Sequence, residues 1–248
     1  MHRFYLPPEH CRGSSLQLTD REAHHATRVL RLRAGDEVLV LDGQGSEIFC
    51  TVLETKKNSV RLTVVSHKST PPPPWQITLL QAVPKGKIIE SIIQKAVELG
   101  VHRIVPLLTD RVVTRLEGAD AAHKAGKLQQ IAVEAIKQCG SPWLPKIELP
   151  MTPKEFLARN EKPELPLIAS LQPGSQHARK YFEQFQSAHR RKPATTCVWI
   201  GPEGDFTLEE VQAIQAAGAL PITLGRLVLR VETAATYCLA ILNHELQA

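Results

Sequence analysis

The chain has 248 residues, which is enough for one or two domains with cores of their own. Thirty basic and 25 acidic side chains give a formal net charge of +5, which fits a polyanionic partner without requiring one. The five cysteines are scattered and form no C-x-x-C pair, so neither a disulfide framework nor a metal site is indicated. Without a secretory signal or a run of about 18 apolar residues, we expect a cytoplasmic protein with no membrane partner.

A run of four prolines, Pro71 to Pro74, divides the chain. Proline donates no backbone hydrogen bond, and consecutive prolines favour an extended, semi-rigid conformation. We therefore predict a first domain at residues 1–70, a linker at 71–74 and a second domain at 75–248. The alternative is a proline-rich loop inside a single domain.

The first domain has the pattern of a small β-barrel. After a predicted helical segment at residues 20–32, apolar residues alternate with polar ones through 38–52 and 60–64. Turn residues at 43–45 and 57–59 separate these runs. The pattern predicts an antiparallel barrel of roughly seventy residues.

The second domain alternates strands with helices, which predicts an α/β fold. Its parallel sheet should be covered by helices on both faces. The predicted strands are residues 77–83, 104–108, 165–171, 197–200 and 222–224, and the predicted helices are 89–99, 128–138, 208–217 and 233–246.

Two glycine-bearing segments follow apolar strands, where ligands bind in open α/β sheets. The first is IGPEGDFT at residues 200–207, in which Thr207 and Glu210 have the spacing of a capping box. The second is LGRLVLRVETAA at residues 224–235, which leads into the last helix. The common nucleotide-binding, protease and hydrolase motifs are absent from the sequence. A plain strand-to-helix turn is the alternative interpretation of the first segment.

These two segments resemble the signature of the RsmE family of SPOUT methyltransferases, which methylate N3 of a uridine in small-subunit (16S) ribosomal RNA. Three further stretches agree with the resemblance: HHATRVLR at 24–31 followed by Gly35-Asp36, QKAVELGV at 94–101, and Glu134-Ala135 with Gln138. The resemblance covers nearly the whole chain, in order.

The resemblance implies a PUA-like RNA-binding barrel followed by a SPOUT α/β domain with a trefoil knot. It also implies a homodimer, S-adenosyl-L-methionine as cofactor, and ribosomal RNA within the assembled small subunit as partner. The implied cofactor-binding residues are Leu171, Gly201, Pro202, Glu203, Gly204, Leu224, Gly225, Leu229 and Arg230. Glycines there would let the backbone approach an adenosyl group closely.

Arg230 and Glu232 are the predicted catalytic residues. Uracil N3 carries a proton at neutral pH, so its methylation needs a base or stabilisation of the developing uracil anion. The Arg230 guanidinium suits the second role, with a salt bridge to Glu232 as the alternative. Glu232 could act as a base, but it could equally favour the start of the last helix. Correct placement of N3 against the methyl group would then supply much of the rate.

Basic side chains supply the predicted RNA contacts, and a simply solvated helix face is the alternative for each of them. The candidates are Arg3, His24, His25, Arg28, Arg31, Lys85 and Lys87, with Lys95 and Arg111 added by the resemblance alone. The target uridine should be unpaired or flipped out of its stack.

Two departures from the family pattern affect the details. Asp205 stands where the family usually has a second glycine, and Ser141-Pro142-Trp143 stands where an arginine is common. Two rival functions stay open: a knotted methyltransferase acting on a ribose 2′-hydroxyl, and a non-catalytic RNA-binding protein of ribosome assembly.

Overall fold

The computed structural model describes residues 1–111, 118–172 and 174–247. The chain forms two compact units, each with its own sheet. Unit 1 comprises Met1–Pro72 and Val133–Leu144, and unit 2 comprises Pro73–Ala132 and Pro145–Ala248. None of the described helices is long and apolar enough to cross a membrane.

Unit 1 is built on a five-stranded sheet in the order β1-β3-β4-β5-β2. Its strands are β1 (His2–Tyr5), β2 (Ser15–Thr19), β3 (Glu37–Leu41), β4 (Ser46–Lys56) and β5 (Ser59–Ser69), with a 3-10 turn η1 (Pro8–His10). The alternating residues at 38–52 and 60–62 point into a buried core with Phe4 and Leu16, as the pattern predicts. The expectation of a purely antiparallel sheet is wrong, because β1 pairs with β3 in parallel. Only four residues long, β1 is too short for its alternation to be recognised.

The predicted helical segment of unit 1 changes type along its length. An α-helix, α1 (Asp20–His24), continues as a π-helix, η2 (His25–Val29). The helix then ends at Arg31, which adopts a left-handed conformation with φ of 54°. The Leu32 N–H donates to the carbonyl of Ala26 at 3.0 Å, and the Leu32 side chain is buried.

The end of helix α3 (Gly118–Cys139) and residues 141–144 belong to unit 1, although they follow the proline run. Lys137 is 7% exposed at its side chain and pairs with Glu22 at 2.7 Å. Further along, Pro142 and Trp143 pack on the turn between β3 and β4. The Gly45 N–H donates to the Pro142 carbonyl, and a Cβ at Gly45 would lie 2.6 Å from the Trp143 ring.

Unit 2 contains a fully parallel six-stranded sheet in the order β11-β9-β10-β6-β7-β8. The strands are β6 (Gln76–Ala82), β7 (Arg103–Leu107), β8 (Lys146–Ile147), β9 (Leu165–Ala169), β10 (Thr195–Ile200) and β11 (Leu220–Ile222). The parallel α/β fold predicted from the sequence is therefore confirmed.

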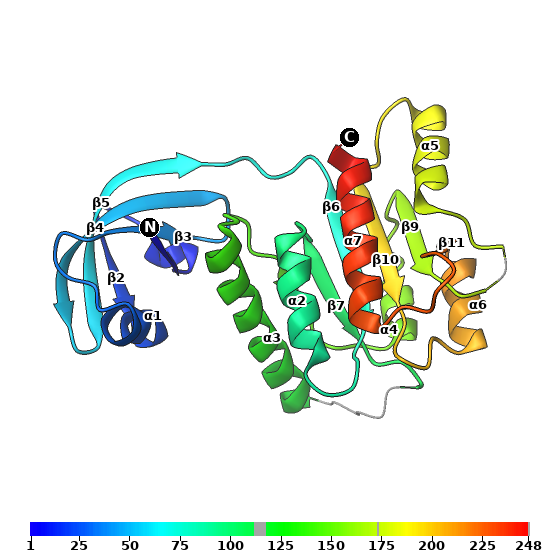
Figure 1. Cartoon of the computed structure of the whole chain (residues 1–248), viewed down its shortest axis with the longest axis horizontal. Helices are drawn as coiled ribbons and strands as arrows, with labels where there is room; N and C mark the ends of the chain where they lie inside the picture. The colour runs from blue at the N-terminus through cyan, green and yellow to red at the C-terminus, as the bar shows by residue number, and fades with distance from the viewer. Residues whose placement is uncertain (112–117, 173, 248) are drawn as a thin grey trace. The chain divides into compact units, whose positions relative to one another are not determined.

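Helices cover both faces of this sheet. They are α2 (Ile88–Glu98), α4 (Pro153–Ala158), α5 (Ala178–His189), α6 (Leu208–Ala216) and α7 (Val231–Gln247). Figure 1 shows α2 and α7 side by side across one face, and α5 also packs against α7. On the other face, Phe156 of α4 and Ile214 of α6 pack with Trp199 and Leu80 of the sheet. Strand β8 and helix α4 were not assigned from the sequence, because they are short.

Candidate active site

Six loops leave the sheet of unit 2 at its carboxyl edge, because all six strands are parallel. The strand order places the loop after β11 next to the end of β9, and the end of β9 next to the turn after β10. The loops after β6 and β7 follow along the same edge. All predicted cofactor residues therefore come together here: Leu171 after β9, Gly201 to Gly204 after β10, and Leu224 to Arg230 after β11.

The turn after β10 is compact. A Cβ at Gly201 would lie 2.8 Å from the Asp205 carboxylate oxygen Oδ1, so a larger residue here would displace the Asp205 side chain. Asp205 is left-handed with φ of 61°, and its Oδ1 accepts a hydrogen bond from the Phe206 N–H at 2.8 Å. Aspartate tolerates this conformation better than most residues, so Asp205 preserves a turn that glycine usually makes. The first family departure therefore has a structural explanation.

The start of α6 confirms the predicted capping box. The Thr207 side chain accepts from the Glu210 N–H, and the Glu210 carboxylate accepts from the Thr207 N–H. The other carboxylate oxygen of Glu210 accepts from the Asp110 N–H at 3.0 Å. Glu210 therefore also fixes the loop after β7, a role that sequence spacing alone could not predict.

Two more hydrogen bonds join neighbouring loops to the same turn. The Lys85 N–H donates to the Glu203 carboxylate at 3.1 Å, and the Arg111 guanidinium donates to the Gly204 carbonyl. These contacts bring two predicted RNA-binding residues, Lys85 and Arg111, beside the turn. Lys87 is exposed at the start of α2 and extends this basic border.

The loop after β11 combines a backbone turn that favours glycine with exposed apolar side chains. Gly225 has φ of 111°, a conformation that L side chains rarely adopt. Leu227 and Val228 are 77% and 78% exposed, and Leu171 of the neighbouring loop is 64% exposed. Such clustering of large apolar side chains on a surface is typical of a binding region.

Arg230 and Glu232 lie where this loop enters α7. The Arg230 carbonyl accepts from the Ala234 N–H at 2.8 Å, which fixes its backbone, while its side chain is exposed. Glu232 lies in the first turn of α7, where negative charge is favoured. Among the described residues, no salt bridge joins the two side chains, so the alternative pairing predicted from the sequence is not formed.

The predicted RNA-binding residues of unit 1 have different surroundings. Arg3 donates to the carbonyls of Lys137 and Gln138, which closes the end of α3. His25 is half-buried, with its ring edge-on to Phe4 at 6.2 Å. His24 and the two arginines of the helical segment are exposed, and both arginines line a shallow notch. In unit 2, the Lys95 ammonium donates to the Ser91 hydroxyl.

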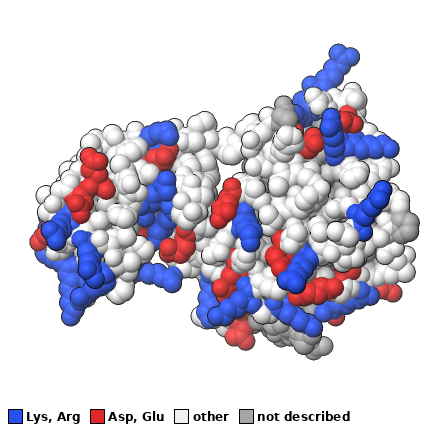
Figure 2. Space-filling model, in the orientation of Figure 1, with Lys and Arg blue, Asp and Glu red and all other residues white. Residues whose placement is uncertain are grey.

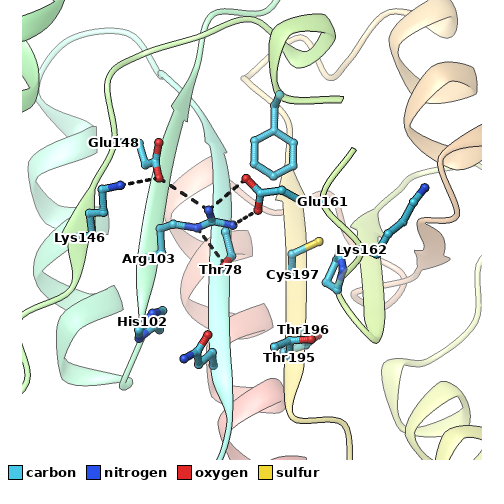
Figure 3. A pocket seen from close by; sticks show the side chains of 13 residues that line it. Thr78, His102, Arg103, Lys146, Glu148, Glu161, Lys162, Thr195, Thr196 and Cys197 are labelled. Atoms are coloured by element: carbon cyan, nitrogen blue, oxygen red, sulfur yellow. Dashed lines mark hydrogen bonds and ion pairs between the residues drawn. The ribbon is translucent and has the colours of Figure 1, made fainter. Parts of the chain in front are cut away.

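A cavity of about 420 Å³ lies at the opposite, amino edge of the unit 2 sheet (Figure 3). Its central Arg103 donates to Thr78 and Glu161, and Glu148 lies 3.6 Å from the same guanidinium. Burial raises the pKa of Glu148, but hydrogen bonds from Arg159 and Lys146 outweigh it and lower the pKa overall. Because these charges already neutralise one another, the cavity is a poorer candidate for a charged ligand than the carboxyl-edge loops.

The chain is similar to known proteins in both sequence and structure. Residues 71–243 match the family model of an RNA methyltransferase domain, and residues 18–65 match that of an RNA methyltransferase PUA domain. Ribosomal RNA small subunit methyltransferase E of Synechocystis sp. is 32% identical, with 100% of this chain and 78% of that protein covered. The corresponding Aquifex aeolicus protein is 30% identical, with 98% and 99% covered.

This chain belongs to the RsmE family.

Two solved structures extend the RsmE comparison. A Legionella pneumophila methyltransferase in complex with S-adenosylmethionine has a TM-score of 0.87 and 32% identity, and the match covers 98% of this chain and 96% of that one. The Neisseria gonorrhoeae RsmE protein bound to S-adenosylmethionine has a TM-score of 0.83 and 28% identity, covering 98% and 97%. The protein is therefore an RNA methyltransferase that combines a PUA domain with an α/β domain.

The second departure from the RsmE pattern also has a structural explanation. The Ser141 hydroxyl donates to the Trp143 carbonyl and accepts from the Trp143 N–H, which holds this segment in a tight turn. Trp143 packs on Gly45, and Leu144 lies close to Gly43. The segment thus packs on the β3–β4 turn within unit 1.

Proposed function

We propose that this protein transfers the methyl group of S-adenosyl-L-methionine to N3 of one specific uridine in 16S ribosomal RNA, within the assembled small subunit. Residues 1–70 would serve as the RNA-binding barrel, 71–74 as the linker and 75–248 as the SPOUT methyltransferase domain. One observation carries the proposal: in a chain that belongs to the RsmE family, the loops after β9, β10 and β11, which hold the predicted cofactor-binding residues, lie at the same edge of the sheet. Methyl transfer to small ribosomal subunits, with identification of the product nucleoside, tests it.

The carboxyl-edge loops fit an adenosyl cofactor. The compact Gly201 turn and the left-handed Gly225 allow close approach to backbone groups. Leu171 and Leu227 provide the apolar surface that an adenine ring needs. In addition, Gln81, next to Ile200 in the sheet, keeps a buried side-chain oxygen without a hydrogen-bond partner among the described residues. These features support cofactor binding by Leu171, Gly201 to Gly204, Leu224, Gly225, Leu229 and Arg230.

The cofactor supplies an electrophilic methyl group on a sulfonium. The chain must therefore hold the uracil ring with N3 facing that group and stabilise the charge that develops when N3 loses its proton. Arg230 has a fixed backbone and an exposed guanidinium at the entrance to α7. Donation from this guanidinium to a uracil carbonyl oxygen would stabilise the anion.

Replacement of Arg230 tests this role. We expect Arg230→Ala to lower the single-turnover methylation rate by about 100-fold, as loss of one positioned donor does in other enzymes, while cofactor binding changes less. Arg179→Ala, which removes an exposed guanidinium from α5, is the control and should methylate normally. Unchanged single-turnover methylation by Arg230→Ala would remove Arg230 from the mechanism.

Glu232 is the candidate base, and its place in the first helical turn also stabilises α7. The two roles predict different pH profiles. If Glu232 removes the N3 proton, Glu232→Gln lowers the rate strongly at neutral pH but less at high pH, where uracil ionises by itself. If Glu232 only stabilises the helix, Glu232→Gln shifts stability while the shape of the rate profile is unchanged.

Substrate binding completes the proposal. Lys85, Lys87, Lys95 and Arg111 would contact RNA near the reaction centre, and Arg3, His24, His25, Arg28 and Arg31 would contact it on the barrel. A homodimer would cover exposed apolar side chains such as Val228 and Tyr237. The trefoil knot and a cytoplasmic location stay predictions. Transfer to a ribose 2′-hydroxyl, or RNA binding without catalysis, are the two outcomes that would replace this function.

A further inference from the structure

A shallow, basic notch of about 390 Å³ lies on unit 1, between the end of η2 and the tip of the β4–β5 hairpin. Five cationic side chains line it: Arg28, Arg31, Arg33, Lys56 and Lys57. Lys and Arg side chains gather over this part of unit 1 in Figure 2. Sequence reasoning identified only the first two, because the other three come from segments with no helical pattern.

The local fold holds the two sides of the notch in place. The left-handed conformation of Arg31 ends the helical segment, and the next residue, Leu32, is buried in the core. Arg31 and Arg33, on either side of Leu32, stay at the surface. On the other side, Lys56 pairs with Ser59 across a two-residue connection, which fixes the hairpin tip. Residues about thirty positions apart thus form one concave surface.

The notch has an excess of positive charge. Among the residues that the structure describes, no aspartate or glutamate lines it, while two threonines, Thr27 and Thr55, add hydroxyl groups. Lys56 has a carboxylate partner, Glu54, at 3.3 Å, but both side chains are largely exposed. Such an exposed pair contributes little and is readily exchanged for another anion. The arginines and Lys57 have no ion-pair partner among the described residues.

We infer that this notch binds the phosphate backbone of the RNA substrate. In the described part of the chain, no aromatic ring lines the notch, so none of these side chains would stack on a base. Five cations exceed what one free phosphate neutralises, and they match a strand that presents several phosphates in succession. The inference rests on the proposed function for the identity of the RNA, but it assigns Arg33, Lys56 and Lys57 a role that the carboxyl-edge site does not explain.

A paired substitution tests the notch directly. The double variant Arg33→Ala/Lys57→Ala removes two charged groups that form no side-chain hydrogen bond or ion pair among the described residues. The control, Arg12→Ala/Arg21→Ala, removes two exposed charges of the same unit outside the notch. Binding of a fluorescein-labelled RNA hairpin with a single-stranded loop is measured by anisotropy at several salt concentrations. Thermal stabilisation by S-adenosylmethionine is measured in parallel.

We expect the notch variant to bind RNA about tenfold more weakly at about 0.15 M salt, from the loss of two phosphate contacts. Its slope of log affinity against log salt should be shallower by about 1.4. The control should bind like the wild type, and cofactor stabilisation should be unchanged in both.

Equal loss of affinity in the two variants would overturn the inference, because general surface charge would then explain the binding. Unchanged affinity in the notch variant would overturn it as well. A third result would also overturn the inference. In it, inorganic phosphate stabilises the wild type but not the notch variant, while both proteins bind RNA equally well. None of these results depends on which atom of the RNA is methylated, so failure of the notch and failure of the proposed reaction are distinguishable.

Discussion

The Lys85 N–H donates to the Glu203 carboxylate at 3.1 Å, which ties the loop after β6 to the turn after β10. Lys85 is a predicted RNA-binding residue and Glu203 a predicted cofactor-binding residue, so one hydrogen bond couples the two halves of the candidate site. Since Glu203 accepts a backbone donor, its main effect should be on loop position.

Substitution of Glu203 separates a positioning role from a catalytic one. Glu203→Ala removes the acceptor and should weaken cofactor binding about fivefold, from the loss of about 1 kcal/mol. Glu203→Gln keeps an acceptor oxygen and should retain both affinity and rate. Isothermal titration with S-adenosylhomocysteine and single-turnover methylation provide the two measurements.

The matched control for this pair is Glu209→Ala, which removes an exposed carboxylate from the first turn of α6. We expect it to bind cofactor normally. An inactive Glu203→Gln variant with normal cofactor affinity would contradict the positioning role and would make Glu203 a proton acceptor.

Asp205 should tolerate glycine better than alanine. Its left-handed backbone costs a residue such as alanine about 1 kcal/mol, and alanine also removes the acceptor for the Phe206 N–H. Asp205→Ala should therefore lower the melting temperature by about 3 °C, whereas Asp205→Gly should stay near the wild type. Scanning fluorimetry with and without cofactor measures both effects. Equal melting temperatures for the two variants would show that backbone strain at this turn is unimportant.

Lys137 should stabilise unit 1 through a nearly buried ion pair. Its side chain and that of Glu22 are 7% and 12% exposed, so Lys137→Ala leaves a carboxylate without its partner. We expect a loss of about 3 kcal/mol in the free energy of unfolding, measured with urea. Arg61→Ala, which breaks an exposed pair with Glu54, should cost about 0.5 kcal/mol or less. In a Lys137→Met background, adding Glu22→Gln removes the unpaired charge and should restore stability. If it does not, the loss of stability is not caused by a buried charge at Glu22.

Stability should also depend on acid through Glu164. Hydrogen bonds from the Arg191 side chain and the Ala194 N–H lower the pKa of Glu164 from 4.5 to about 2. Because the folded pKa lies below the unfolded value, the stabilisation is complete above pH 4.5 and is lost as pH falls toward 2. Glu164→Gln should therefore lower the urea midpoint at pH 7 but match the wild type near pH 2. A difference that stays constant across this range would contradict the assignment.

Much of the fold follows from sequence periodicity, and the exceptions have identifiable causes. The strands around Leu79, Val105 and Val198 are buried on both faces and read as continuous apolar runs. Strand β1 and helix α4 are too short to show a period. The return of residues 133–144 to unit 1 depends on tertiary contacts, such as that between Gly45 and Trp143, which no local pattern records.

The candidate site was predictable to a similar degree. Two glycine segments identified the carboxyl edge, since glycine, strand ends and the capping box at Thr207 are visible in the sequence. The links from Glu203 to Lys85 and from Glu210 to Asp110 were not, because each joins residues about one hundred positions apart. Only Arg28 and Arg31 of the basic notch were predicted, because the other three basic residues lie outside the predicted helical segment.

The most direct test of the proposed function is methyl transfer from isotope-labelled S-adenosylmethionine to purified small ribosomal subunits, followed by nuclease digestion and nucleoside analysis. We predict that the label appears in 3-methyluridine, at one position of 16S ribosomal RNA. Label on a ribose oxygen or on another base would contradict the proposed reaction, as would an absence of labelled RNA from a protein that binds the cofactor.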